Sequence, residues 1–292
     1  MPKPAPRWRL DRRFKALFLL LIVVAIIAAV FLAREVNKYR VGSGRYEDIA
    51  QAVLPSRATD LPSQASTPIP PTAPPAPGHT ATPAPTLGPT LSPQELELRQ
   101  IEAILPVDFN RLHSINPNAV GWIYNQGTTL DYPVVQGDDN EYYLTHMIDG
   151  TPNKLGSIFM DQRNKPDFSD DVTVIYGHNM EDGSMFTSLE KYKQQAFFDQ
   201  HPRIYLRTPG GIMRLELFSG MLIRPEEFDE FKRNFDSADE KLAAIRDFKE
   251  RSTFKTTLTP DPSDRLLTLV TCVYDFPGAR FIVIGRLVPL SL

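Results

Sequence analysis

Cysteine is almost absent from this chain, which has one cysteine, Cys272, among its 292 residues. A single cysteine excludes a framework of intrachain disulfides. An excess of positive charge is also lacking: 32 lysines and arginines against 35 acidic residues give a net charge of −3, so nucleic acid is not expected as a partner. No group of cysteine, histidine and acidic residues has the spacing of metal ligands, and we expect neither a metal nor a cofactor.

Charged residues are missing from residues 16–33, an apolar run of 18 residues near the N-terminus. As a helix rising about 1.5 Å per residue, this run would span roughly 27 Å, close to the thickness of the hydrocarbon core of a bilayer. Residues 1–15 are basic, which predicts a cytoplasmic tail, a single retained transmembrane anchor over 16–33, and a globular part outside the cell. A cleaved signal peptide is the alternative, although no clear small-x-small cleavage site follows the run. The juxtamembrane segment, residues 34–54, has a mixed composition that can continue the helix.

Charged and aromatic side chains are also scarce in residues 55–93, which are rich in Pro, Thr, Ser and Ala. Such a segment cannot bury enough apolar surface to offset the entropy lost on ordering, so we expect an extended, disordered tether. In polyproline II geometry, at about 3.1 Å per residue, it would reach on the order of 100 Å. That length predicts a globular domain working well away from the bilayer, within a cell wall for example.

The globular part begins with a helix start signal, Ser92-Pro93-Gln94-Glu95, which combines a capping box with proline at the first helical position. From Val120 the apolar period changes to two, which is typical of strands. Further helices are expected near 109–115, 141–147, 188–198 and 226–251, the last with a second capping box at Ser237 to Glu240. The candidate strands are Val120–Tyr124, Leu130–Gln136, Ser157–Asp161, Val172–Tyr176, Arg203–Arg207, Met213–Ile223, Leu266–Thr271 and Arg280–Val288. Many short strands favour a barrel or a sandwich, so residues 94–292 are predicted to form one mostly β domain with helices, of the α+β class.

Three residues with complementary chemistry lie at the ends of these strands. Cys272 follows the apolar run Leu266–Thr271, and His178 follows the run Val172–Tyr176 after one glycine. Arg280 opens the last strand, and if that strand pairs antiparallel with the run before Cys272, the arginine returns close to the thiol. A thiol becomes a nucleophile when a base or a cation lies beside it, and a guanidinium can neutralise the oxyanion of a tetrahedral intermediate.

Each of these residues alone has an ordinary structural interpretation. The thiol can be buried and inert, the histidine can be structural, and the arginine can be a solvated strand end. Asp275 lies near the site and could orient His178, although a loop acid is the plainer interpretation. Asp161, Asp170 and Asp171 are interpreted as turn and surface residues.

Together the three residues resemble the signature of sortases, the membrane-anchored cysteine transpeptidases of Gram-positive cell surfaces. That signature is a histidine at the end of one barrel strand, T-L-x-T-C on another strand, and a following arginine. The matching residues are Tyr176-Gly177-His178, Thr268-Leu269-Val270-Thr271-Cys272 and Arg280. Segments 131–136, 157–161, 177–180 and 182–186 look like class B, and the resemblance covers residues 95–292. The long proline-rich segment departs from the compact class B layout.

The resemblance implies a closed β-barrel of about eight strands, with N-terminal helices and a helix inserted before the strand of Cys272. It also implies a two-step acyl transfer. Cys272 attacks the threonine carbonyl of a C-terminal sorting signal to give a thioester, His178 protonates the leaving amine and later deprotonates an incoming one, and Arg280 holds the oxyanion.

By the same resemblance, the partners are secreted proteins that carry a sorting signal, and an amine of a peptidoglycan cross-bridge or a pilin. Class B members are associated with Asn-Pro-x-Thr-x signals of haem-uptake proteins, while other members anchor other proteins or polymerise pilins. The predicted substrate-binding residues are Thr271, Asn179 and Tyr274. The helix within 226–251 is expected to wall the groove for the signal.

Three other functions fit part of the pattern. An extracytoplasmic cysteine protease would use the same Cys–His pair with water as acceptor. An L,D-transpeptidase would carry a His-Gly-Cys type of motif, whereas Thr271 precedes the cysteine here. A non-catalytic surface-binding module would have an incidental thiol.

Overall fold

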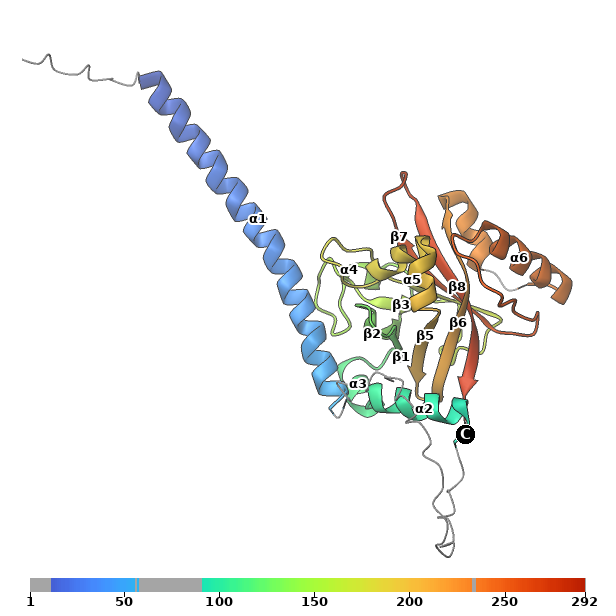
Figure 1. Ribbon diagram of the computed structural model, residues 1–292. Coiled ribbons are helices and arrows are strands. Elements are labelled where there is room, and N and C mark those ends of the chain that lie inside the picture. The colour runs from blue at the N-terminus through green and yellow to red at the C-terminus, as the bar shows by residue number, and fades with distance from the viewer. Residues whose placement is uncertain (1–11, 56, 58–90, 233–234, 292) are drawn as a thin grey trace, which may run out of the picture.

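The computed structural model describes residues 12–55, 57, 91–232 and 235–291. Within these residues the sheet is a closed barrel with strand order β1-β2-β3-β4-β7-β8-β6-β5 (Figure 1). The strands are β1 (Ala119–Tyr124), β2 (Asp131–Gln136), β3 (Ile158–Met160), β4 (Val172–Tyr176), β5 (Arg203–Thr208), β6 (Gly211–Ile223), β7 (Leu266–Cys272) and β8 (Arg280–Leu290). The predicted fold class is therefore confirmed, and the choice between barrel and sandwich is resolved in favour of the barrel.

The apolar runs of β4 and β7 are continuous because both faces of these strands are covered. On the inner face, Ile175, Leu267 and Leu269 belong to the main core of the barrel. On the outer face, Val174, Leu266 and Val270 belong to a second apolar cluster, which includes Ile245 and Phe248 of α6 (Ala238–Arg251). Parallel strands covered on both faces are expected to lack polar alternation, and β4 and β7 pair in parallel.

The short helices surround the barrel near the predicted positions. They are α2 (Pro93–Ile104), α3 (Phe109–Ile115), α4 (Tyr142–Thr145), α5 (Gln195–Gln200) and the 3₁₀ helices η1 (Thr187–Lys193) and η2 (Pro225–Lys232). The capping box at the start of α2 is present in both directions between Ser92 and Glu95. At α6 the Ser237 side chain accepts from the Glu240 backbone, while the Glu240 carboxylate accepts from Asp236 N at 2.8 Å. The single helix expected within 226–251 is two pieces, η2 and α6.

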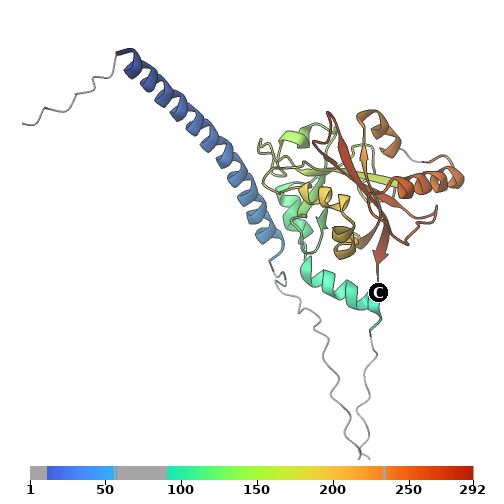
Figure 2. The same cartoon turned by 45° about the horizontal axis from the view of Figure 1, so that its top comes forward.

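Helix α1 (Arg12–Val53) is continuous over 42 residues, and it is long and apolar enough to cross a membrane. Its first half, including Leu17 to Leu32, is exposed, whereas Tyr46, Ile49 and Val53 are buried against the barrel domain. Figures 1 and 2 show the second half of α1 beside the barrel and the first half leading away from it; the C-terminus lies near α2. The juxtamembrane segment, residues 34–54, thus continues the helix as far as Val53, and its last part, from Gly42, packs on the domain. The expected tether falls mainly on 56 and 58–90, and most of the basic tail on 1–11, which lie outside the described residues.

Candidate active site

The topology of the barrel brings the three predicted residues to one edge. β4 and β7 are parallel, with Tyr176 opposite Val270, so both strands end at the same edge. His178 follows the end of β4 and Cys272 ends β7. β7 and β8 are antiparallel, and Cys272 is the register partner of Arg280. The expected return of the arginine to the thiol is therefore what the register shows.

A pocket of about 180 Å³ lies at this edge, and it is lined by His178, Cys272 and Arg280 together with Thr271. The remaining lining residues are Asn140, Leu144, Phe159, Tyr176, Gly177, Phe228 and Val270. A larger hollow, of about 490 Å³, lies elsewhere, between His113, Gln136 and Thr208. It contains no thiol, so the chemistry of the side chains, not the size of the hollow, locates the candidate site.

The boundary between the buried part of β7 and the exposed surface lies between Thr271 and Cys272. Leu266 to Thr271 are all buried in β7, and Cys272 is exposed at its end. The strand is held on both sides by β4 and β8. A thiol at the end of such a strand has a fixed backbone and free access to a substrate.

The ring of His178 is held by a backbone carbonyl. Its Nε2 lies 2.7 Å from Leu144 O, just before the end of α4. A carbonyl oxygen can only accept, so Nε2 carries a proton, and in the neutral ring Nδ1 is the nitrogen with the free lone pair. The chain on either side is also fixed, because Gly177 N donates to Val270 O and Phe186 N donates to His178 O. Leu144 contributes a backbone atom, so its side chain carried no signal by which the sequence could reveal this contact.

The guanidinium of Arg280 lies against an aromatic ring. Its Cζ is 4.7 Å from the centroid of Phe228 in η2, and Nη1 donates to Gly278 O at 3.2 Å. Phe228 is the residue by which the 226–251 segment reaches the pocket, so η2, not α6, forms this wall. The role of Phe228 depends on a tertiary contact with Arg280, so the local sequence could not reveal it.

Asp275 belongs to a bridge between loops. Its carboxylate accepts from Lys193 Nζ at 2.6 Å, and Lys193 also donates to Glu190 at 2.8 Å. Glu190 in turn accepts from Asn179 Nδ2 at 3.0 Å. Burial alone would lower the pKa of Lys193, but the bonds to Asp275 and Glu190 outweigh it and raise that pKa. The chain of contacts links the segment after His178 to the loop between Cys272 and Arg280.

The predicted substrate-binding residues lie in three different settings. Thr271 lines the pocket, and its buried hydroxyl has no hydrogen-bond partner within the described part of the chain. Asn179 is engaged with Glu190. Tyr274 is 81% exposed on the loop after β7. Of the three, Thr271 alone is among the pocket-lining residues.

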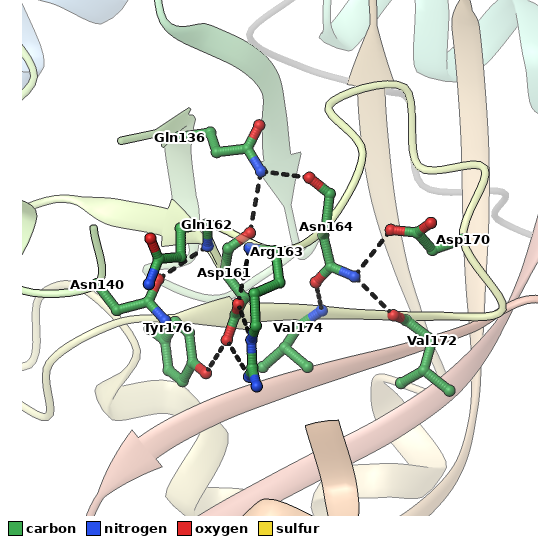
Figure 3. A network of polar contacts seen from close by, with 10 residues as sticks. All are labelled: Gln136, Asn140, Asp161, Gln162, Arg163, Asn164, Asp170, Val172, Val174 and Tyr176. Carbon is green, nitrogen blue, oxygen red and sulfur yellow. Dashed lines mark hydrogen bonds and ion pairs between the residues drawn. The ribbon is translucent and has the colours of Figure 1, made fainter. Parts of the chain in front are cut away.

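Asp161 was expected on the surface, and that interpretation is wrong. It is 1% exposed and accepts bonds from Tyr176 Oη at 2.7 Å and from Arg163 Nε and Nη2, both at 2.9 Å (Figure 3). Burial opposes ionisation of Asp161, but the bonds from Arg163 and Tyr176 lower its pKa to about 2. Burial, together with the bond to Asp161, raises the pKa of Tyr176. The network holds a pocket-lining phenol in its neutral form.

Asn140, which also lines the pocket, is fixed to the same region. Its side-chain oxygen accepts from Gln162 N at 2.9 Å, which leaves its amide N–H groups as donors. The sequence analysis did not single it out. Asp170 accepts from Lys165 N and fits the turn role expected of it, and Asp171 pairs with the buried Lys241.

Comparisons with known proteins point to one family. A family model described as a sortase domain matches residues 123–288. Sortase B of Listeria monocytogenes is 34% identical over 179 residues, which cover 61% of this chain and 72% of that protein. Sortase B of Staphylococcus aureus is 31% identical over 200 residues, covering 68% of this chain and 81% of that protein.

Solved structures give the same answer. A Staphylococcus aureus sortase B–substrate complex superposes with a TM-score of 0.60 at 31% identity, over 63% of this chain and 85% of that one. Clostridium perfringens sortase B gives 0.59 at 33% identity, over 62% of this chain and 100% of that one. A sortase B complexed with triglycine gives 0.58 at 31% identity, over 63% of this chain and 86% of that one.

Proposed function

The chain belongs to the sortase family, is similar to its class B members and is a cysteine transpeptidase; from this premise we propose that Cys272, His178 and Arg280 carry out the transfer. The observation that supports the proposal is their convergence on one pocket from the ends of three adjacent strands. Parallel pairing of β4 with β7 and the Cys272–Arg280 register produce that convergence.

In the first step, the thiolate of Cys272 attacks the threonine carbonyl carbon of the bound signal, and the carbonyl π pair moves onto oxygen. Arg280 neutralises this oxyanion with the guanidinium N–H groups that do not bind Gly278. The pair then reforms the carbonyl, the C–N bond breaks, and the leaving amine takes a proton from His178. A thioester on Cys272 and a shortened leaving peptide result.

In the second step, an amine attacks the thioester and gives its proton to His178, and the C–S bond breaks to return the thiolate. The bond from Nε2 to Leu144 O supports both steps, because an acceptor there stabilises the charged imidazolium. Nδ1 is then the nitrogen that gains and loses the proton. The amide N–H groups of Asn140 and the buried hydroxyl of Thr271 supply polar contacts for the signal's backbone.

The proposed substrates are secreted proteins with a C-terminal sorting signal, and the proposed acceptor is an amine of a peptidoglycan cross-bridge or of a pilin. The relatives solved as a substrate complex and with triglycine support a peptide substrate and a glycine-type acceptor. We also propose a single-pass cell-membrane location, with the N-terminus cytoplasmic and the barrel outside. The apolar first half of α1 supports this location.

The experiment is a peptide library varied at the first, second and last positions of a five-residue Asn-Pro-x-Thr-x signal, incubated with and without triglycine. Ligation that exceeds hydrolysis, and a thioester adduct on Cys272, are expected. Hydrolysis that is indifferent to the amine would instead assign the chain to extracytoplasmic cysteine proteases. Cys272→Ala is the control, and turnover in that variant would remove the cysteine from the mechanism.

A further inference from the structure

The second half of α1 has one face built for the barrel domain. Gly42, Tyr46, Ile49 and Val53 are all buried, and they recur at intervals of four, three and four residues. This spacing places them on one side of a helix. At Gly42 the approach is close: a Cβ there would lie 3.0 Å from Leu155 Cδ2 and 3.1 Å from Asn153 Nδ2.

Polar contacts fix the same face along its length. Tyr46 Oη donates to Gly156 O at 2.6 Å, and its ring meets Tyr132 edge-on with centroids 5.3 Å apart. Arg45 pairs with Asp149 at 2.7 Å. At the end of the helix, Val53 O accepts from Asp108 N at 3.0 Å. Apolar burial and directional bonds together hold the helix on the barrel domain in one position and one rotation. We call this contact face of α1, formed by Gly42, Tyr46, Ile49 and Val53, its seat.

The seat begins close to the end of the apolar run. Asn153 Nδ2 donates to Lys38 O at 3.3 Å, and Lys154 Nζ lies 3.5 Å from the ring centroid of Tyr39. Tyr39 is six residues beyond Ala33, which is roughly 9 Å along a helix. α1 is helical throughout this stretch, so there is no loop in it that could act as a hinge.

The proline-rich segment starts and ends on the same body. Before it, Leu54 is 5% exposed, and Arg57 pairs with Asp131. After it, α2 buries Leu98 and Ile101 in the same core cluster as Val53. A segment with both ends on one domain cannot set how far that domain stands from the membrane, whatever its length.

The seat of α1 also adjoins the chain that holds the catalytic histidine. Leu155 and Gly156, which contact Gly42 and Tyr46, are in the segment that runs back to α4 and Leu144. Ser157 N donates to Tyr143 O at 2.8 Å and ties the two parts of this segment together. The carbonyl of Leu144 that binds His178 is therefore one residue from Tyr143, whose backbone is bonded to the residue that follows Gly156.

We infer that α1 and the barrel form one rigid unit, in which the helix, and not the proline-rich segment, sets the height and orientation of the Cys272 pocket at the bilayer surface. The inference rests on the membrane anchoring proposed above and replaces the tether expected from composition. It implies that a sorting signal is cleaved close to the membrane, at one fixed height.

Cys272 provides the probe, because it is the only cysteine of the chain. The full chain, labelled there with a fluorescent donor, is placed in nanodiscs whose lipids include an acceptor, and energy transfer reports the height of the pocket. Shortening residues 58–90 by half, or inserting a second copy of them, is expected to leave the transfer efficiency unchanged, because either length still connects Arg57 to the start of α2. A polar helical insert of about 18 residues after Val36, five turns in phase, should lift the pocket by roughly 27 Å and sharply reduce the transfer.

A double variant, Gly42→Trp with Tyr46→Ala, tests the seat itself. After it, the efficiency should depend on the length of 58–90, while peptide cleavage by the unlabelled variant confirms that the barrel is folded. In the chain with its natural seat, an efficiency that follows the length of 58–90 and ignores the helical insert would overturn the inference. A chain that fails to associate with nanodiscs refutes the anchoring itself, which is a different result.

Discussion

Replacing Arg280 gives the sharpest test of the proposed chemistry. The guanidinium has five N–H donors, and one of them, on Nη1, donates to Gly278 O at 3.2 Å. Its Cζ lies 4.7 Å from the ring centroid of Phe228. The remaining N–H donors are the ones that we propose bind the oxyanion. Loss of one oxyanion donor typically lowers kcat by about 10²–10³, or roughly 2.7–4 kcal/mol of barrier. Arg280→Ala should therefore slow acylation of Cys272 by about that factor.

Arg280→Lys separates charge from geometry. An ammonium keeps the charge but cannot reproduce a planar fork that binds a carbonyl, stacks on a ring and holds an oxyanion at once. We expect this variant to recover only part of the lost rate. Arg286→Ala is the matched control on the same strand, because its partners are Glu216 and Asp264, and the acylation rate should not change.

The assay is single-turnover formation of the thioester, followed by quenching and intact-mass measurement, with a sorting-signal peptide in excess. Triglycine is omitted, so that deacylation does not mask the first step. Acylation of Arg280→Ala at the wild-type rate would refute the assignment of the oxyanion to Arg280. A raised KM with an unchanged kcat would assign the arginine to ground-state binding of the signal instead.

Three further predictions follow from the contacts around the pocket. Lys193→Met should lower kcat for ligation several-fold by freeing the loop that ends at Arg280, and Lys193→Arg should restore part of it; equal rates for Met and wild type would rule the bridge out as a positioning device. Asp161→Asn should lose about 2 kcal/mol of unfolding free energy at pH 7, since a pKa lowered to about 2 adds stability that is present above pH 4 and lost as pH falls through 2. Urea titrations of the variant and the wild type at pH 7 and near pH 2 measure the difference in their unfolding free energies. A difference that persists in acid contradicts the reasoning. Gly177→Ala would put a Cβ 2.6 Å from Phe186 Cγ and should cost about 1–3 kcal/mol by thermal unfolding, whereas Gly44→Ala, with open space around it, should not.

Local signals in the sequence were sufficient for the elements and for placing the three proposed catalytic residues at strand ends. Helix caps, proline at the first helical position and apolar period depend on neighbouring residues, and Val172–Tyr176 was found with the bounds that the structure shows. The thiol and the imidazole were found because each follows a continuous apolar run. These runs can be recognised in the sequence because β4 and β7 are covered on both faces, so their side chains do not alternate between apolar and polar.

What the fold adds are contacts between distant backbones and burials that no local pattern encodes. The carbonyl of Leu144 carries no side-chain signal, and the burial of Asp161 depends on Tyr176 and on Arg163 closing over it. Asp275 could be placed near the site by its position in the loop, but its partner, Lys193, comes from a 3₁₀ helix 82 residues earlier.

By itself, the sequence determined which functional groups adjoin the apolar strands, namely one thiol, one imidazole and one guanidinium, and that an apolar helix precedes them. The tertiary structure decided which of these strand ends share an edge, and which face of α1 is covered. The physical reason is that strand pairing and helix docking depend on surfaces far apart in the chain. Composition can predict that a segment is extended, but not that the residues before and after it rest on the same domain.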